Sequence, residues 1–409
     1  MVKKKILLIL GLLFFPWIIS GQTIIGQYEE EAPLKSWNIS GFIPASGLGR
    51  AEIMTIRADN PAVAFSNPSL LTDLPRLSLF FNGSINQASL FRFAIVNTGV
   101  LKSNQNLWVK IMALDGAGLA LKLNSWSLSF GAAIKEYYDR PTASAESISG
   151  GKTTYRINFN QEGFLRTYNF SLARKIGNFL AVGLSFNYSQ GKIKRKTEEA
   201  WPLNQISILD SKEGSLKDLY LRFGLKASIT NSLKISLTFE PSHKLTKESQ
   251  SRVKYSAETT KTVISIEDEA KDFLMKPFQI SLAGSYLWKE RWLLLAEAIF
   301  FNWSKYKLTW FSQEETRNFR DILRLAAALE TSQSLTLFHQ SFILITRVGF
   351  LIDPQPMKIP RSTYYGLTSG LGLHWKWLRL DLGASWSQEK GSGSSLQTIR
   401  SALALNALF

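Results

Sequence analysis

The amino-acid sequence predicts an all-β protein: a closed antiparallel transmembrane β-barrel of about 14 strands with an N-terminal plug. Three observations lead to this prediction. The chain opens with a secretion signal, long segments alternate between apolar and polar residues, and the chain ends on an aromatic residue of such a segment. Together they place the mature protein in the bacterial outer membrane, where barrels of this kind reside.

Residues 1–21 have the three parts of a cleavable signal peptide. Positions 3–5 are lysines, positions 6–19 form an apolar stretch, and positions 20–21 supply small residues for cleavage. The apolar stretch of about 14 residues is shorter than the roughly 20 that a membrane-spanning helix needs, and Pro16 interrupts it. We therefore expect secretion with removal of residues 1–21, rather than a membrane anchor.

Residues 22–75 do not alternate and are rich in turn-forming residues. Gly47 and Gly49 permit tight bends, and Asn67-Pro68 is a typical turn start. The glycine pair is not a dinucleotide site, because it follows no buried strand and opens no amphipathic helix. About 50 residues precede the first expected strand, and a wide barrel can hold a segment of that length in its interior. We expect residues 22–75 to form a plug.

Residues 76–409 alternate with period two. In the segment 219–229, Leu221, Phe223 and Leu225 alternate with polar or small residues, whereas a helix would spread apolar residues over a period of 3.6. The alternating segments run for about 11 to 18 residues, against 5–6 for a typical soluble strand. We expect the three apolar residues to face lipid and their neighbours to face an enclosed interior. A large soluble β-sandwich is the alternative.

Short and long connections alternate along this region. Long polar segments at 140–161, 195–213 and 249–276 are interpreted as outer loops, and tight turns as periplasmic. Counting back from Phe409 gives about 14 strands, with both chain ends on the periplasmic side. The tight turns are expected near residues 124–125, 176–177, 231–232, 290–291 and 375–377.

Aromatic residues mark the ends of the expected strands. Trp288 and Trp292 bracket one tight turn, and Trp375 and Trp377 bracket another, as aromatic girdles at the membrane interface do. Phe409 closes the chain on an alternating segment. A terminal aromatic residue in this position resembles the recognition signal read by the barrel-assembly machinery, which we expect to be a partner.

The motif before the first expected strand resembles that of the FadL-like outer-membrane transporter family. The family has a Gly-rich and Ala-rich segment followed by an Asn-Pro-Ala-Gly-Leu-like motif, and residues 67–71 of this chain match it with Ser69 and Leu70 in place of Ala and Gly. Pro277-Phe278 and the Pro-rich residues 353–360 are also similar.

The resemblance implies passive uptake of hydrophobic molecules such as long-chain fatty acids. Ligand would bind in an apolar pocket near the plug and leave sideways through a kinked wall. Gly131, in the third strand, is the candidate for a weak point in that wall. The related PorV-like proteins share the N-terminal pattern and serve protein secretion or surface attachment, which gives the alternative function. Uptake predicts a continuous apolar tunnel, whereas a scaffold predicts large ordered outer loops and no through-path.

Other chemistries find little support in the sequence. The three histidines, His243, His339 and His374, lack metal-ligand spacing, and the chain has no cysteine. His339 and Ser341 are close in sequence but fall at an expected periplasmic turn. The formal net charge is +16, yet the basic residues are spread along the chain, which does not favour nucleic acid. We expect no enzyme, no metal site and no cofactor.

Period-two parity predicts which residues line the interior. An electropositive interior would suit the carboxylate head group of a hydrophobic ligand. The alternative is that the inward cations pair with inward acids and with plug acids such as those at positions 29–31, because unpaired buried charge is costly. The basic run at 192–196 falls at an expected outer strand end, where it is expected to bind lipopolysaccharide phosphates or no ligand; binding of substrate is the alternative. The candidate ligand-binding residues are Arg222, Lys226, Arg324, Arg347, Leu293 and Leu295.

Overall fold

The computed structural model describes residues 39–89, 100–105, 108–310, 313–316, 318–337, 339–359, 361–393 and 395–409. The expected signal peptide at 1–21 and the acids at 29–31 lie outside these residues, and both stay predictions. Within the described residues, no helix combines the length and the apolarity that crossing a bilayer requires.

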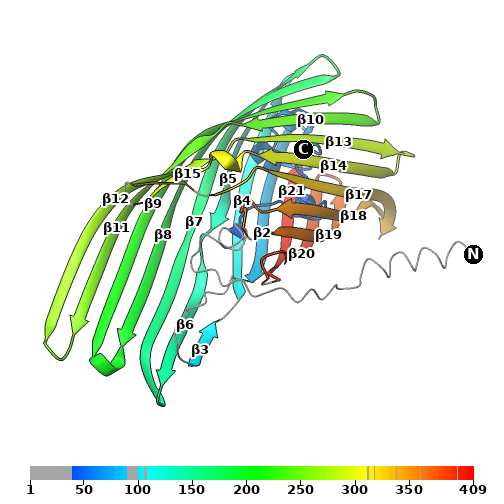
Figure 1. Cartoon of the computed structure of the whole chain (residues 1–409). Helices are drawn as coiled ribbons and strands as arrows, with labels where there is room; N and C mark the ends of the chain where they lie inside the picture. Colours follow the sequence, from blue (N-terminus) through cyan, green and yellow to red (C-terminus); the bar gives the residue numbers. More distant parts are fainter. Residues whose placement is uncertain are drawn as a thin grey trace, which may run out of the picture.

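Fourteen strands close into an antiparallel barrel, as the alternation predicts (Figure 1). The ring closes because the first strand pairs on one side with the last and on the other with its neighbour. Its strands are β2 (Leu77–Ser89), β4 (Trp108–Leu123), β5 (Trp126–Tyr137), β7 (Lys152–Ile176), β8 (Leu180–Trp201), β9 (Ile206–Ser228), β10 (Leu233–Glu240), β13 (Gln279–Trp288), β14 (Trp292–Phe301), β17 (Ile322–Leu337), β18 (Gln340–Pro354), β19 (Thr363–Trp375), β20 (Leu378–Lys390) and β21 (Gln397–Leu408).

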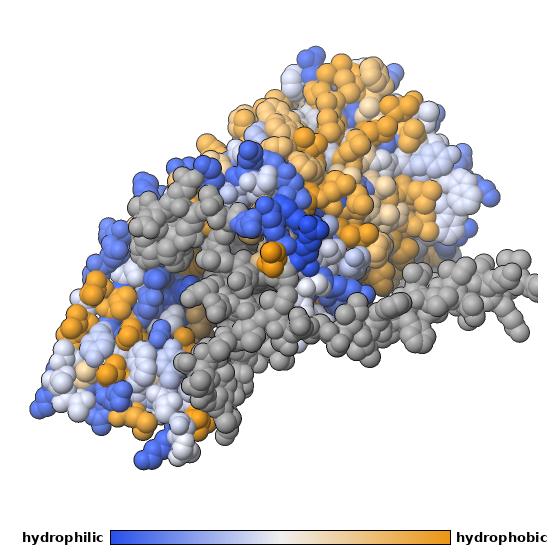
Figure 2. Space-filling model, in the orientation of Figure 1, coloured by the Kyte–Doolittle hydropathy of each residue, from blue (hydrophilic) through white to orange (hydrophobic). Residues whose placement is uncertain are grey.

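The outer face of the barrel is apolar, as expected (Figure 2). Phe223 and Leu225 are 43% and 39% exposed, while Gly224 between them and Lys226 after them are buried. At the tight-turn end, the ring of Trp377 stacks on that of Phe409 with centroids 5.1 Å apart. The backbone N–H of Phe409 donates to the carbonyl of Leu77 over 2.8 Å, so the last residue joins the first barrel strand.

At the opposite end, the expected long outer loops are wrong. Residues 140–161, 195–213 and 249–276 lie almost entirely in β6 (Arg140–Ser149), β7, β8, β9, β11 (His243–Ala257) and β12 (Thr262–Lys276). β7 has 25 residues, or about 80 Å at 3.3 Å per residue, far more than a bilayer crossing needs. The strands continue beyond the barrel as a sheet (Figure 1). The pairings give the strand order β6–β7–β8–β9–β11–β12 in this sheet. We call it the outer sheet.

The described part of the N-terminal region, residues 39–75, lies inside the barrel. Its α3 (Ala45–Leu48) contacts β19, β20 and β21, whereas η3 (Pro68–Asp73) contacts β7, β8 and β9 on a different part of the wall. Between them, η2 (Pro61–Phe65) contacts β4 and β5. Ala45, Leu70 and Leu71 are completely buried. We call residues 39–75 the N-terminal segment.

The wall is stepped between β4 and β5. The two strands pair only from Leu123↔Trp126 to Gly116↔Ala133. Beyond that point β5 pairs instead with β1 (Ile39–Ser40) of the N-terminal segment. Ile134 and Tyr137 of β5 then pack against Val109 and Ile111 of β4, so the strands overlap.

Gly131, suggested by the sequence as the weak point, is itself paired with both neighbouring strands. The ring of Phe65 occupies the space beside it, 2.9 Å from where a Cβ atom would lie. The pairing between β4 and β5 ends two residues later, and the irregularity lies at Lys135, which is skipped in the register with β7. The departure of β5 from its neighbour is therefore centred on that bulge rather than on the glycine.

Candidate functional site

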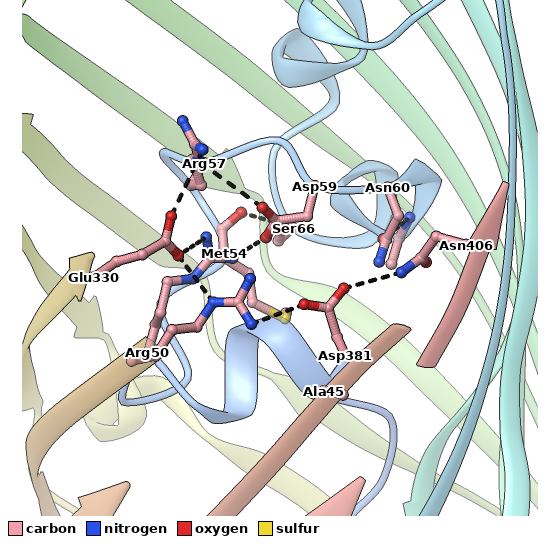
Figure 3. A network of polar contacts seen from close by, with 12 residues as sticks. Ala45, Arg50, Met54, Arg57, Asp59, Asn60, Ser66, Glu330, Asp381 and Asn406 are labelled. Carbon is pink, nitrogen blue, oxygen red and sulfur yellow. Dashed lines mark hydrogen bonds and ion pairs between the residues drawn. The ribbon is translucent and has the colours of Figure 1, made fainter. Parts of the chain in front are cut away.

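A buried network of ion pairs joins the N-terminal segment to the barrel wall (Figure 3). Arg347 of β18 is completely shielded from solvent and donates to Glu330 over 2.9 Å and to Asp381 over 2.8 Å. From the N-terminal segment, Arg50 pairs with Asp59 and lies 3.5 Å from the same Glu330. Charged groups that leave water need such partners. We call these residues the central network: Arg50, Arg57, Asp59, Glu330, Arg347 and Asp381.

The ionisation of Asp59 makes the central network sensitive to acid. Burial by itself would raise the pKa of Asp59, but the charges of Arg50, Arg347 and Arg57 outweigh burial and hold this pKa below its usual value. An unfolded aspartate has a pKa of about 3.9. Because the pKa of Asp59 is lower in the folded protein, ionised Asp59 stabilises the fold at pH values above about 4. This stabilisation is lost as the pH falls from about 4 toward the folded pKa.

We expect the free energy of unfolding to drop between about pH 4 and pH 2 in the wild type and to change less in Asp59→Asn. Urea unfolding in detergent micelles, followed by tryptophan fluorescence, measures this difference at each pH. Parallel pH curves for the two proteins would show that Asp59 is not the responsible group.

The four cations singled out from the sequence all have acidic partners. Arg222 pairs with Glu240, Lys226 with Asp73, Arg324 with Glu52 over 2.6 Å, and Arg347 with the two acids named above. Two of these partners, Asp73 and Glu52, belong to the N-terminal segment. If the inward cations are paired, the sequence suggests the acids at positions 29–31 as their partners in the plug. Those positions lie outside the described residues, and the partners that the structure shows, Glu52 and Asp73, come later in the chain. Binding of ligand by the four cations stays a prediction.

The two leucines singled out from the sequence lie beside the N-terminal segment. Leu295 is 3% exposed and belongs to a cluster with Ala51 and Ile53 of that segment, and Leu293 packs against the same cluster. Their inward orientation agrees with parity. The apolar surface that they offer is covered by the chain itself, and their contact with a ligand stays a prediction.

The four residues of the expected plug motif act in turns and close packing. Asn67 is fully buried: its Nδ2 donates to the carbonyl of Thr55 over 2.6 Å, and its Oδ1 accepts from the N–H of Ser69 over 3.1 Å. Pro68 follows as the first residue of η3. Gly49 lies against Gly370 of β19, whose Cα would be 2.8 Å from a Cβ atom on Gly49, and Gly47 lies against Met54.

We expect Asn67→Ala to lower the free energy of unfolding by about 2 kcal/mol. The reason is the loss of a helix cap together with a buried carbonyl left without its donor. Asn231→Ala, in an exposed turn, is the matched control and should change little. Urea titration of both variants in the same detergent measures the difference. Equal stability of the two variants would contradict a structural role for Asn67.

A second polar cluster, which sequence patterns did not reveal, lies where the barrel meets the outer sheet. The imidazole of His243 stacks on the ring of Tyr220 with centroids 4.4 Å apart, and the Nζ of Lys135 lies 4.0 Å from the centre of that ring. Lys276 pairs with Glu136 over 2.8 Å. The bulge at Lys135 brings β5 residues to β9, β11 and β12, and a bulge leaves no regular sequence signal. No group of three metal-ligating side chains occurs among the described residues.

The pocket beside the central network is small. It has room for about one water molecule, far less than a fatty-acid chain or an aromatic ring requires. Its lining comes entirely from the N-terminal segment: Pro44, Ser46, Arg50, Met54, Arg57, Asp59, Asn60, Ala62 and Val63.

Comparison with solved structures shows the FadL type of fold. The toluene transporter TbuX of Ralstonia pickettii has a TM-score of 0.61 at 14% identity, covering 90% of this chain and 99% of that one. A FadL homologue of Pseudomonas aeruginosa has a TM-score of 0.59 at 12% identity, covering 90% and 100%. The toluene transporter TodX of P. putida has a TM-score of 0.60 at 12% identity, covering 90% and 99%. At identities this low, the TM-scores show a shared barrel fold and no more.

No curated protein matches this chain in sequence. A family model does match. The model of the BamG family aligns with residues 41–390, from the N-terminal segment to the end of β20. The match therefore includes the central network, the stepped wall and the outer sheet, and this bacterial outer-membrane barrel with a FadL-type fold belongs to the BamG family.

Proposed function

We propose that this protein is an outer-membrane scaffold that holds another protein at its outer sheet, in the service of barrel assembly or protein secretion. The outer sheet carries the proposal. Six strands continue past the bilayer as an ordered surface, where an ordinary channel needs only loops. A scaffold is expected to have large ordered outer loops, and here an ordered sheet takes the place of those loops.

The interior of the barrel supports the same proposal. All four of the inward cations suggested for ligand binding pair with acids, and the N-terminal segment contacts opposite parts of the wall. We propose that residues 22–75, of which 39–75 are described, plug the barrel permanently. The BamG family match supports a relation to the barrel-assembly machinery.

Shortening the outer sheet tests the scaffold. Glu248 and Lys271 are directly opposite in the β11–β12 ladder, so an Asn-Gly turn can replace residues 249–270 without altering the register. We expect the shortened protein to insert and fold normally but to lose most of its activity as a scaffold. The measurement is the abundance of other barrel proteins and of surface-exposed proteins in the outer membrane of cells that carry only this variant.

A control deletion separates length from position. Arg195 and Lys212 are opposite in the β8–β9 ladder, and replacing residues 196–211 by the same turn trims a different hairpin. Loss of function in one deletion with retention in the other would locate the partner surface. Normal outer-membrane composition with both deletions would contradict the scaffold proposal.

Uptake of hydrophobic molecules, such as fatty acids or small aromatic compounds, is the second candidate. It is favoured by the fold shared with toluene transporters and by the apolar cluster at the stepped wall, which includes Val109, Ile111 and Ile134. Leu293, Leu295 and the four cations would then be the ligand contacts. Vesicles containing the purified protein should take up labelled oleate or toluene faster than vesicles containing an unrelated barrel; equal rates would remove this candidate.

A further inference from the structure

Four cations gather on the lipid-facing side of the wall, where the strands leave the apolar band. Gln190 of β8 is directly opposite both Arg166 of β7 and Lys217 of β9, which places these two cations in one row across three strands. Lys192 is two residues further along β8, and Lys244 lies one strand beyond, on β11, which pairs with β9. We call these residues the headgroup patch: Arg166, Lys192, Lys217 and Lys244.

The patch lies at the level of the lipid headgroups. Tyr168 and Tyr188 are directly opposite each other and about 40% exposed, as expected of rings in an interfacial aromatic belt. From the tight turn before Leu180 to Tyr188, about nine residues tilted by roughly 40° rise about 23 Å, close to the height of a barrel's apolar band. The row of Arg166 and Lys217 comes directly after this belt.

The charges of the patch are not neutralised by the protein. No acidic partner occurs for these four side chains within the part of the chain that the structure describes. Cations further out on the same strands differ, since Lys194 and Lys196 each have a glutamate, at 3.6 Å and 2.6 Å. Glu248, on the same face, is paired with Lys271 over 3.1 Å. The four patch cations therefore present unpaired positive charge next to the lipid.

The linear run at 192–196, which the sequence pointed to, contributes only one residue to the patch. Alternation turns Arg195 to the other face of the sheet, where its guanidinium lies 4.9 Å from the ring centre of Phe159. Within the patch, the Nζ of Lys244 lies 4.1 Å from the ring centre of Phe273. Aromatic rings beside cations suit an amphipathic ligand, whose polar group meets the charge while its apolar part meets the ring.

We propose that the headgroup patch binds the phosphate groups of an outer-leaflet glycolipid, the lipid A part of lipopolysaccharide. Phosphates carry the negative charge that would neutralise the patch. In a membrane lipid they lie at this height, while the acyl chains lie against the apolar band below. Cations near a membrane surface attract such headgroups, and their long apolar stems lie on the wall. The inference is independent of the proposed scaffold function.

Native mass spectrometry of the detergent-solubilised full-length protein tests the proposal. The probes are diphosphoryl lipid A and the same lipid A after removal of both phosphates. The wild type should bind the diphosphoryl form at least about tenfold more tightly, and the variant K192Q/K217Q/K244Q should lose that preference. K192R/K217R/K244R keeps the charges and should keep it. Heat-modifiable gel migration confirms that each variant is a folded barrel.

The matched control is R252Q/K254Q/K261Q, which removes three exposed cations from the far end of β11 and its turn and should bind like the wild type. Equal binding of both lipids by the wild type, or undiminished preference in the glutamine variant, would overturn the proposal. Inorganic phosphate at millimolar concentration should not displace lipid A. If it did, the site would be one for free anions and the lipid assignment would fail.

Discussion

Arg347→Ala is expected to lower the free energy of unfolding by about 3–5 kcal/mol. The guanidinium has no exposed surface, and its removal leaves Asp381 without its ion pair and Glu330 with one partner fewer. Breaking a buried pair by removing one partner costs this much because the other charge stays buried. Urea unfolding in detergent, followed by tryptophan fluorescence, measures the loss.

Two further variants locate the cause of the Arg347 effect. Arg347→Met combined with Asp381→Asn and Glu330→Gln removes the charges together and should recover part of the lost stability. Arg252→Ala breaks an ion pair whose partners are 67% and 65% exposed, and it should change little. If Arg347→Ala were no more harmful than Arg252→Ala, the buried ion pairs of Arg347 would not stabilise the barrel.

Gly383→Val is expected to push the N-terminal segment off the β20 wall. A Cβ atom at this position would lie 2.1 Å from the carbonyl oxygen of Ala45 and 3.0 Å from its carbon, which are backbone atoms and cannot rotate away. The segment must shift, and overpacking of this kind costs about 1–3 kcal/mol or more. Gly224→Val should act similarly from the opposite part of the wall, where the Oδ1 of Asn67 lies 2.1 Å from the Cβ position.

A thiol probe measures this displacement directly, because the chain has no cysteine. Ala62 is 1% exposed, so Ala62→Cys should react slowly with a maleimide in an otherwise wild-type protein and at least about tenfold faster with Gly383→Val added. Gly284→Val is the control, since the nearest atom to its Cβ position is 3.9 Å away. Similar labelling rates with the two valines would mean that the segment is not held by close contact with the wall.

The barrel could be predicted because its strongest constraint, the alternation of lipid-facing and inward-facing residues, can be recognised in the sequence. Each strand that faces lipid on one side and the interior on the other must alternate, so parity alone placed Phe223 and Leu225 outside and Arg222 and Lys226 inside. Closure follows, because a membrane strand without two neighbours would leave backbone groups unpaired in hydrocarbon. The tight turns and the strand number were predictable for the same reason.

The outer sheet could not be predicted in this way. Beyond the bilayer both faces of a strand meet water, so β11 and β12 need no alternation and their polar residues read as loops. Ladder pairing with a neighbour makes them strands, and that partner is known only once the barrel has set the register of β9. The acidic partners of two inward cations could not be predicted either. Asp73 and Glu52 lie in the N-terminal segment, whose residues show no regular alternation.

The sequence by itself determined the membrane barrel and the orientation of its side chains, because these follow from short-range periodicity and composition. Only the tertiary structure decided that the inward cations are paired, that β5 steps behind β4, and that Arg166, Lys192, Lys217 and Lys244 form one patch. Such features depend on which strands become neighbours and in what register. That information lies in contacts between residues distant in the chain, and no local pattern carries it.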